Sequence, residues 1–296
     1  MDIITINSIP RDWELIGGGS EADIYDVGDG RVAKIYKDWD SPGYAGGFSP
    51  DTMKDKFWEI QFKLLDMPDL PSEVIVPESL IVAPRGSVFG YFMPKIDDAI
   101  PLDKVYNDAN CDATEKNLII EALYRLLIAV HDCGAVIGDF VARDLAWNIS
   151  TKSLVMYDGD SISFGDWNSN AFSLGSVDPN FLQFRTNNGK EEAILDRPLT
   201  KESDWFAFLT ICCRVYIGID PYEVAHPKYD KTLCVKHGVS IFTKGVTFPD
   251  SMPDFKSVIP LALLREMFLA IVNGERKTPL PESVLNPEIY KKKEEV

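Results

Sequence analysis

The segment at residues 131–164 carries three carboxylates, Asp139, Asp144 and Asp158, on two loops separated by a short turn and an apolar run at 154–157. The run is bounded by polar turn residues, which predicts a buried strand that ends at an acidic loop. Phosphoryl transfer depends mainly on positioning and on neutralising charge, so two or three acids with magnesium suffice for it chemically. The segment is therefore a candidate site, although aspartates that form turns and cap helices give the same pattern.

A glycine turn near the N-terminus is the second candidate element. Residues 13–37 predict a strand, a glycine-rich turn, a strand, a tight turn at Asp29 and Gly30, and a third strand. Glycines let a backbone approach phosphates closely, although a plain hairpin also explains such a turn. Lys34 stands among apolar residues of the third strand, where an unpaired lysine is costly. We expect it to face a ligand rather than the core, so that Lys34→Ala leaves the thermal transition nearly unchanged.

These two elements resemble the protein-kinase superfamily. Gly17, Gly19 and Ala22 occupy the positions of its glycine-rich loop, and Lys34 resembles the lysine that binds the α- and β-phosphates of ATP. The resemblance implies that Lys34 has a glutamate partner on the helix predicted at 51–66, and Glu59 is the only glutamate of that helix. The alternative interpretation is that Glu59 is a solvated side chain of a charged helix. It implies contacts to ATP from Gly17, Gly18, Gly19, Ser20, Ile24, Ala33 and Lys34, with adenine near the backbone of Met93 and Lys95.

Two alignments of the carboxylate segment with the kinase catalytic loop are open. One matches the R-D-L sequence at 143–145 and makes Asp144 the base, but Asn148 then follows only four residues later. The other matches the G-D sequence at 138–139, which puts Asp144 five residues after the base and leaves a strand, a turn and a strand before Asp158. The second alignment keeps the family's spacing, and we adopt it.

On this alignment the resemblance implies a role for each acid. Asp139 is the catalytic base that orients the acceptor hydroxyl, and Asp144 stands where the family has a metal-binding asparagine. Asp158 holds Mg²⁺, or Mn²⁺ in its place, against the phosphates of ATP, with Asp160 as a helper. His131, at the end of the preceding predicted helix, is interpreted as structural.

A second resemblance lies at residues 204–222, which are similar to the kinase signature D-x-W-x-x-G, a helix, and G-x-x-P. Its aspartate, Asp204, is expected to brace the backbone of the catalytic loop. Near the C-terminus Arg276 resembles an arginine whose usual partner is the glutamate of an A-P-E sequence, which this chain lacks. The acids expected to replace that glutamate are Asp178, Glu191 or Glu192.

The matches cover about residues 15–285 and imply an α+β, bilobal protein-kinase-like fold. Its N-lobe, at 1–94, would hold a small antiparallel sheet and one helix, and its C-lobe, at 95–296, would be mostly helical. The length of 296 residues by itself also suggests two domains. Two departures stand out, because Gly138 replaces the arginine of H-R-D and Gly159 the phenylalanine of the DFG sequence. Both are similar to divergent bacterial or viral members of the superfamily.

Composition limits the partners and the compartment. The net charge of −16 argues against nucleic acid or an anionic membrane as the main partner. The five cysteines are odd in number and form no C-x-x-C pair, which favours a reducing cytoplasm over a disulfide framework or zinc site. The N-terminus lacks the pattern of a signal peptide, and no apolar stretch is long enough to span a membrane.

Three hypotheses follow for function. The leading one is an ATP-dependent protein kinase of the Ser/Thr type, which transfers the γ-phosphoryl group of Mg-ATP to a hydroxyl of an unidentified protein. The second is a small-molecule kinase on the same fold. The third is a pseudokinase scaffold, which binds nucleotide without turnover.

Overall fold

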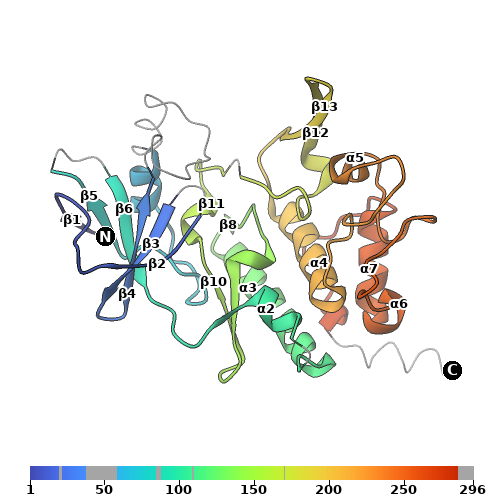
Figure 1. The fold of residues 1–296 in the computed structure, drawn as a ribbon, viewed down its shortest axis with the longest axis horizontal. Coiled ribbons are helices and arrows are strands. Elements are labelled where there is room, and N and C mark those ends of the chain that lie inside the picture. The colour runs from blue at the N-terminus through green and yellow to red at the C-terminus, as the bar shows by residue number, and fades with distance from the viewer. Residues whose placement is uncertain (20–21, 38–58, 85–87, 109, 170, 286–296) are drawn as a thin grey trace. The chain divides into compact units, whose positions relative to one another are not determined.

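The structure, a computed structural model, describes residues 1–19, 22–37, 59–84, 88–108, 110–169 and 171–285 (Figure 1). The chain divides into two compact units. Unit 1 contains Met1–Asp98 together with the short segment Tyr157–Asp160, and unit 2 contains Ala99–Met156 and Ser161–Val296. The chain thus leaves unit 2 after Met156 and returns to it at Ser161, carrying two aspartates into unit 1.

The boundary between the units follows Asp98 rather than residue 94, where the sequence analysis put it. Lys95 is attached to the sheet of unit 1, because its backbone N–H donates to the Gly30 carbonyl (2.8 Å) and its ammonium pairs with Asp26 (2.6 Å). The segment at 157–160 was assigned to the second lobe and instead belongs to unit 1.

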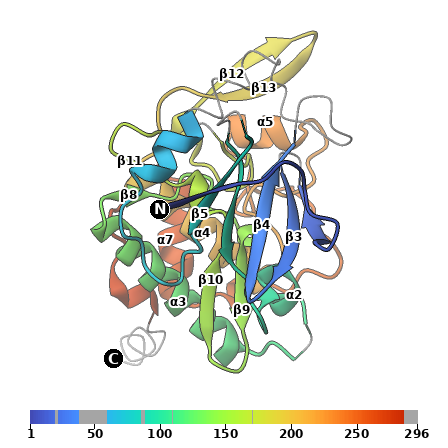
Figure 2. The ribbon, with the colours of Figure 1, turned by 90° about the vertical axis from the view of Figure 1, so that its left-hand side faces the viewer.

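Unit 1 is built on one six-stranded sheet in the order β1-β5-β6-β4-β3-β2. Its strands are β1 (Asp2–Thr5), β2 (Glu14–Gly18), β3 (Ala22–Gly28), β4 (Arg31–Tyr36), β5 (Ser79–Val82) and β6 (Val88–Pro94). Every neighbouring pair is antiparallel except β1 and β5, which are parallel. Figure 2 shows β3 and β4 side by side. The sheet is therefore antiparallel, as expected, apart from its unforeseen edge strand β1.

The predicted hairpins of unit 1 are confirmed. β2, β3 and β4 follow the pattern expected at 13–37, and the turn uses left-handed backbone at Asp29 (φ 50°) and Gly30 (φ 77°). Further along the chain, β5 begins only at Ser79, although the apolar residues start at Val74. Pro77 lies just before β5, and proline has no N–H to donate to a neighbouring strand.

The alternation of side chains along β4 separates two apolar clusters. Val32 and Tyr36 belong to one cluster and Ala33 and Ile35 to the other, so Lys34 projects on the side of Val32 and Tyr36. The helix expected at 51–66 is helical at 59–65, and residues 51–58 lie outside the described residues. Its Ile60 and Leu64 join the cluster of Val32 and Tyr36.

Unit 2 combines helices with small antiparallel sheets. The helices are α2 (Leu102–Tyr106), α3 (Ala113–Asp132), α4 (Lys201–Ile217), α5 (Lys231–Lys236), α6 (Phe255–Val258) and α7 (Leu261–Ile271). The strands are β7 (Ile100–Pro101), β8 (Ala135–Val136), β9 (Leu145–Asn148), β10 (Ser153–Met156), β11 (Ser163–Phe164), β12 (Leu182–Asn187) and β13 (Lys190–Leu195). They form the sheets β10-β9-β7, β11-β8 and β12-β13, and α4 packs against both α3 and α7 (Figure 1). The chain is thus of mixed α+β class.

Helix α3 leads into the carboxylate segment and begins after a capping aspartate. Asp112 caps it, because its side chain accepts from the backbone N–H of Glu115 at 2.9 Å. The helix buries one apolar stripe, which includes Ile119, Leu123 and Leu127. It positions His131 and the loop that follows.

Two further expectations concern cysteines and membranes. All five cysteines lie in the described part of the chain, and each is a free thiol. Within the described ranges, no helix has the length and apolar character needed to cross a membrane.

Candidate functional site

Lys34 lies at the centre of a buried charge cluster in unit 1. Its ammonium donates to Oδ1 of Asp158 at 2.5 Å and to the two oxygens of Asp160 at 2.9 and 3.2 Å. The hydroxyl of Tyr36, which follows Lys34 on the same face of β4, donates to Asp160 Oδ2 at 3.0 Å. Lys63, from the helix at 59–65, donates to the backbone carbonyl of Asp160 at 2.7 Å. The structure therefore brings together Lys34, Asp158 and Asp160, which sequence analysis had placed in one site.

The electrostatics distinguish the two aspartates. Burial opposes the charge on Lys34, but the Asp160 and Asp158 carboxylates outweigh it and raise the pKa of the ammonium. Burial also opposes ionisation of Asp160, yet the Lys34 ammonium lowers its pKa to about 2. Burial and the neighbouring Asp160 charge instead raise the pKa of Asp158. Asp160 therefore retains its negative charge more strongly than Asp158 does.

Exposure separates the same two side chains. The Asp158 side chain is 41% exposed, whereas that of Asp160 is 12% exposed and both its oxygens accept hydrogen bonds. Among the described residues no three His, Cys, Asp or Glu side chains gather as a metal-binding group. Of the two acids, Asp158 is the better placed to take an oxygen-binding cation such as Mg²⁺.

The predicted ion pair between Lys34 and Glu59 is wrong. Glu59 is exposed, and the carboxylates that contact the Lys34 ammonium come from Asp158 and Asp160. The apolar stripe of the helix identified its buried face correctly through Ile60 and Leu64. Glu59, at a different position around the helix, does not share that face.

The glycine turn connects β2 and β3. Gly17 and Gly18 end β2, and the backbone N–H of Gly19 donates to the carbonyl of Ala22 at 2.8 Å. Ser20 lies outside the described residues. Ile24 is opposite Lys34 in the register of β3 and β4 and packs against the same apolar cluster. Ile24 is thus on the strand next to Lys34, and the glycines of β2 are one strand further out.

The predicted contacts of Ala33 and Lys95 with the nucleotide differ from expectation. Ala33 is fully buried on the face of the sheet opposite Lys34, so it cannot share a ligand with Lys34, and Val32 holds the position on the correct face. Met93 is buried in the cluster of Val32 and lies opposite it on β6. The N–H of Lys95 already donates within the sheet, which removes it as a donor for adenine.

Gly159 stands between the two aspartates because no side chain fits there. A Cβ atom at this position would collide with the backbone carbonyl oxygen of Ile75 and lie 3.0 Å from Val74 Cγ1. Asp158 itself adopts left-handed backbone (φ 63°), a strained conformation for a residue other than glycine. The close approach explains the glycine in place of the kinase phenylalanine.

Gly159→Ala is expected to lower the free energy of unfolding by roughly 1–3 kcal/mol, the usual cost of overpacking a filled site. The backbone of Ile75 would have to move to make room. Urea denaturation measures the effect, with Gly19→Ala as control, because a Cβ at Gly19 meets nothing within 4 Å. Equal stability of the two variants would contradict the assignment.

A second cluster, in unit 2, surrounds Asp139. Ser173 Oγ donates to Asp139 Oδ2 at 3.2 Å, and Arg143 donates to the same oxygen at 3.2 Å and to Ser173 Oγ at 2.8 Å. Asp139 Oδ1 is buried and has no hydrogen-bond partner among the described residues. Burial raises the pKa of Asp139. A buried carboxylate oxygen with no partner is suited to accept a proton or hydrogen bond from a ligand.

Asp204 braces the loop before Asp139, as expected. It is fully buried in the first turn of α4, and its two oxygens accept from the backbone N–H groups of Ile137 and Gly138, each at 2.8 Å. Oδ2 also contacts His131 Nε2 at 2.9 Å, which fits a structural role for that histidine. The bracket fixes Gly138, whose left-handed backbone (φ 82°) turns the chain toward Asp139.

Asp204→Ala is expected to lower the free energy of unfolding by roughly 1–3 kcal/mol for each of the two amides that it leaves buried and unpaired. Urea denaturation measures the total loss in the free energy of unfolding, and faster hydrogen exchange at the amides of Ile137 and Gly138 shows where the loss arises. Asp112→Ala is the control, because it removes only an exposed helix cap, at about 1 kcal/mol. Wild-type stability with unchanged exchange at both amides would refute the bracket.

Asp144 and Asn148 lie at the two ends of strand β9. Asp144 ends the short helical turn Ala142–Asp144 directly before β9, and its Oδ1 lies 3.8 Å from Arg143 Nε. Asn148 ends β9, and its Oδ1 accepts from the backbone N–H groups of Ser150 and Thr151 at 3.0 Å each. Asn148 therefore forms the hairpin turn.

Arg276 has the acidic partner that the sequence required. Asp178, fully buried, accepts from the guanidinium at 2.5 and 2.6 Å. Of the other two acids considered, Glu191 pairs with Lys236, and Glu192 accepts from the Asn187 side chain. The paired fork of Arg276 and Asp178 is the strongest geometry for such an ion pair.

Three contributing residues were missed by sequence analysis. Tyr36 stands two residues after Lys34, so the period of a strand could have placed it on the same face. Lys63 and Ser173 reach Asp160 and Asp139 from distant segments, and no local pattern marks them.

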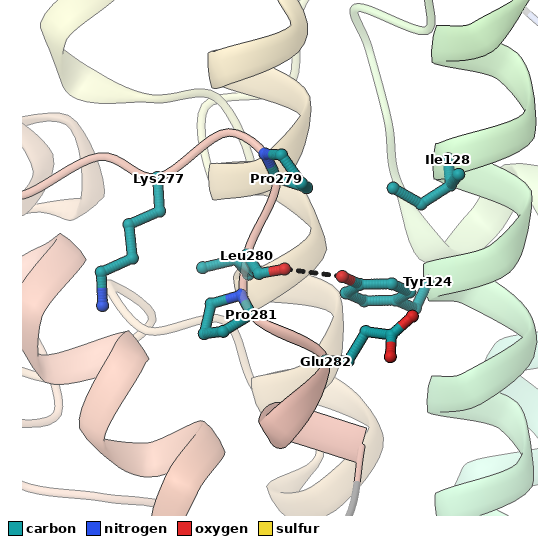
Figure 3. A pocket seen from close by; sticks show the side chains of 7 residues that line it. All are labelled: Tyr124, Ile128, Lys277, Pro279, Leu280, Pro281 and Glu282. Atoms are coloured by element: carbon teal, nitrogen blue, oxygen red, sulfur yellow. Dashed lines mark hydrogen bonds between the residues drawn. The ribbon is translucent and has the colours of Figure 1, made fainter.

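A surface pocket of about 570 Å³ lies elsewhere in unit 2, between α3 and the segment after α7 (Figure 3). Tyr124 and Ile128 line it from α3, and the Tyr124 hydroxyl donates to the Leu280 carbonyl at 2.6 Å across its floor. None of the predicted site residues lines it. Its lining is mostly apolar, with Lys277 and Glu282 as its charged residues.

In comparisons with known proteins, no protein-family model and no curated protein matches this chain.

Proposed function

We propose that the protein is an ATP-dependent phosphotransferase of protein-kinase-like fold, with unit 1 as the N-lobe and unit 2 as the C-lobe. It transfers the γ-phosphoryl group of Mg-ATP to a hydroxyl, most simply that of a serine or threonine in another protein. The proposal draws on the resemblance in sequence and on the two clusters around Lys34 and Asp139.

One observation carries the proposal: the ammonium of Lys34 is held by Asp158 and Asp160, from a segment more than a hundred residues away in the chain. A kinase site needs both a strand lysine that binds phosphates and an acid that holds the metal ion, and this contact joins a candidate for each. Burying a lysine and two carboxylates costs desolvation free energy, which their mutual attraction need not fully offset, so such a cluster suggests a function. The side chain of Asp158 remains exposed enough to bind an ion.

Three further features support the proposal. The antiparallel pairing of β5, β6, β4, β3 and β2, with a helix packed against the face that bears Lys34, fits the small sheet and single helix expected of a kinase N-lobe. The bracket of Asp204 on the loop before Asp139 matches the expected brace of a catalytic loop. The Arg276–Asp178 pair replaces the ion pair of the family's large lobe.

The residues have the following roles in the proposed reaction. The acceptor hydroxyl oxygen attacks the γ-phosphorus, the bond to the β–γ bridging oxygen breaks, ADP leaves, and the hydroxyl proton passes to Asp139. Asp158 would be a ligand of Mg²⁺, which would neutralise phosphate charge when bound. The resemblance gives Asp144 a metal-binding role as well. Lys34 binds the α- and β-phosphates once its contact with Asp158 is released.

The test is incubation of the purified protein with γ-labelled ATP, Mg²⁺ and cell lysate, with Asp139→Asn as the inactive control. Label on protein that depends on Asp139 supports the proposal. Label in a small-molecule fraction indicates a small-molecule kinase, and ATP binding without transfer indicates a pseudokinase. A chain that neither binds nor consumes ATP refutes the proposal.

A further inference from the structure

We infer that Asp160 is the residue that positions Lys34 for catalysis, in place of a glutamate on the helix at 59–65. The inference rests on the proposed function and deepens it. It assigns the two acids of the 158–160 segment different tasks, with Asp158 for the metal ion and Asp160 for the lysine.

The contacts of Asp160 fit an anchor. Its Oδ1 accepts from Lys34, and its Oδ2 accepts from Lys34 and from the Tyr36 hydroxyl. Its backbone carbonyl accepts from Lys63. Side chains of β4 thus hold the Asp160 carboxylate in place. The carboxylate in turn keeps the Lys34 ammonium at a defined position over β4, even when a phosphate draws that ammonium away from Asp158.

The same contacts make Asp160 a poor metal ligand. A cation at this carboxylate would have to displace Lys34 or Tyr36 from oxygens that are almost completely buried. Asp158 makes the shorter contact to Lys34, 2.5 Å, but its side chain is far more exposed, so it can exchange the ammonium for an ion. A bound cation near Asp158 would repel the ammonium toward Asp160 and the phosphates.

This arrangement removes Glu59 from the positioning of Lys34, because Glu59 is exposed. The helix at 59–65 contributes instead through Lys63, which donates to the backbone carbonyl of Asp160. The anchor is instead carried by the same short segment that carries the metal-binding acid. We therefore expect Lys34 to be positioned whenever Asp158 is.

The experiment compares Asp160→Asn, Asp158→Asn and Glu59→Gln by kcat, KM for ATP, and the Mg²⁺ concentration that gives half-maximal rate. Asp160→Asn is expected to lower kcat by about a hundredfold, as for a misplaced catalytic group, with the Mg²⁺ requirement unchanged. Asp158→Asn is expected to raise the Mg²⁺ requirement, and Glu59→Gln to behave as wild type.

A double variant tests the coupling directly. Lys34→Met with Asp160→Asn is expected to be no slower than Lys34→Met alone, because the two residues act as one unit. If Asp160→Asn fails to fold, Tyr36→Phe provides the milder change, since it removes only one hydrogen bond to the carboxylate. It should lower kcat and leave the Mg²⁺ requirement unchanged.

Each opposite outcome overturns the inference. A raised Mg²⁺ requirement in Asp160→Asn would make Asp160 a metal ligand, and a loss in Glu59→Gln equal to that in Asp160→Asn would restore the helix glutamate. Full activity of Asp160→Asn would exclude any role in positioning. A wild-type protein that binds no ATP would refute the proposed function itself, and the inference with it.

Discussion

Lys34→Met is expected to lower the free energy of unfolding by roughly 3–5 kcal/mol, the usual cost of removing one partner from a buried ion pair. The Lys34 side chain is only 14% exposed, and its ammonium lies between the carboxylates of Asp158 and Asp160. The methionine would fill the space of the lysine stem but remove the ammonium that contacts both acids. The sequence alone predicted a nearly unchanged thermal transition, and the buried cluster revises that expectation.

Urea denaturation at neutral pH measures the change, with Lys95→Met as the matched control. Lys95 also pairs with an aspartate, Asp26 at 2.6 Å, on the same sheet, but that pair is more exposed, and exposed ion pairs stabilise a fold little. Equal losses in both variants would show that the cluster around Lys34 is no more than a surface ion pair.

The pH dependence provides a second check of the same variant. The folded-state pKa of Asp160 is lowered from 3.8 to about 2, so its ionised form stabilises the fold above 3.8 and this contribution is lost as the pH falls toward about 2. Without Lys34 that stabilisation is missing, so the difference between wild type and Lys34→Met should shrink over this range. A constant difference would mean that Asp160 is not coupled to Lys34.

Local patterns in the sequence were enough to predict much of the fold. The three strands at 13–37 and the strand, turn and strand before Asp158 follow from turn chemistry and side-chain period. The bracket at Asp204 and the partner of Arg276 were foreseen from resemblance, the latter as one of three acids. These features depend on residues that are close in sequence or on spacing that a family shares.

The errors concern contacts between distant segments. The buried face of the helix at 59–65 was predicted correctly. That face does not determine which acid contacts Lys34, because Asp160 belongs to the distant segment at 157–160. Strand β1 was missed because its pairing partner, β5, lies far along the chain and its own four residues are mostly exposed. Tertiary pairing of this kind has no local signature.

Ala33 illustrates a different error. The resemblance to the kinase family put Ala33, the residue directly before Lys34, in the nucleotide site. A strand has a period of two, so the residue next to Lys34 must project to the other face, where Ala33 is in fact buried. The physical rule would have selected Val32 without a structure.

Asp139→Asn is expected to abolish phosphoryl transfer while ATP binding persists, because the base contacts the acceptor and not the nucleotide. Asparagine keeps the size of the side chain, and it can still contact Ser173, so the fold around it should survive. Turnover and ATP affinity are measured together. In the wild type, burial raises the pKa of Asp139, so the rate should fall with falling pH through a pKa above 3.8.

Two companion variants decide whether Asp139 or Asp144 is the base. Asp144→Ala should raise the Mg²⁺ requirement, since a carboxylate ligand is lost, and Asn148→Ala should leave it unchanged, because the Asn148 side chain accepts from the backbone of its own hairpin turn. If Asp144 were the base and Asn148 the ligand, the outcomes would exchange and Asp139→Asn would be active. Turnover by Asp139→Asn would therefore overturn the alignment on which the catalytic assignment depends.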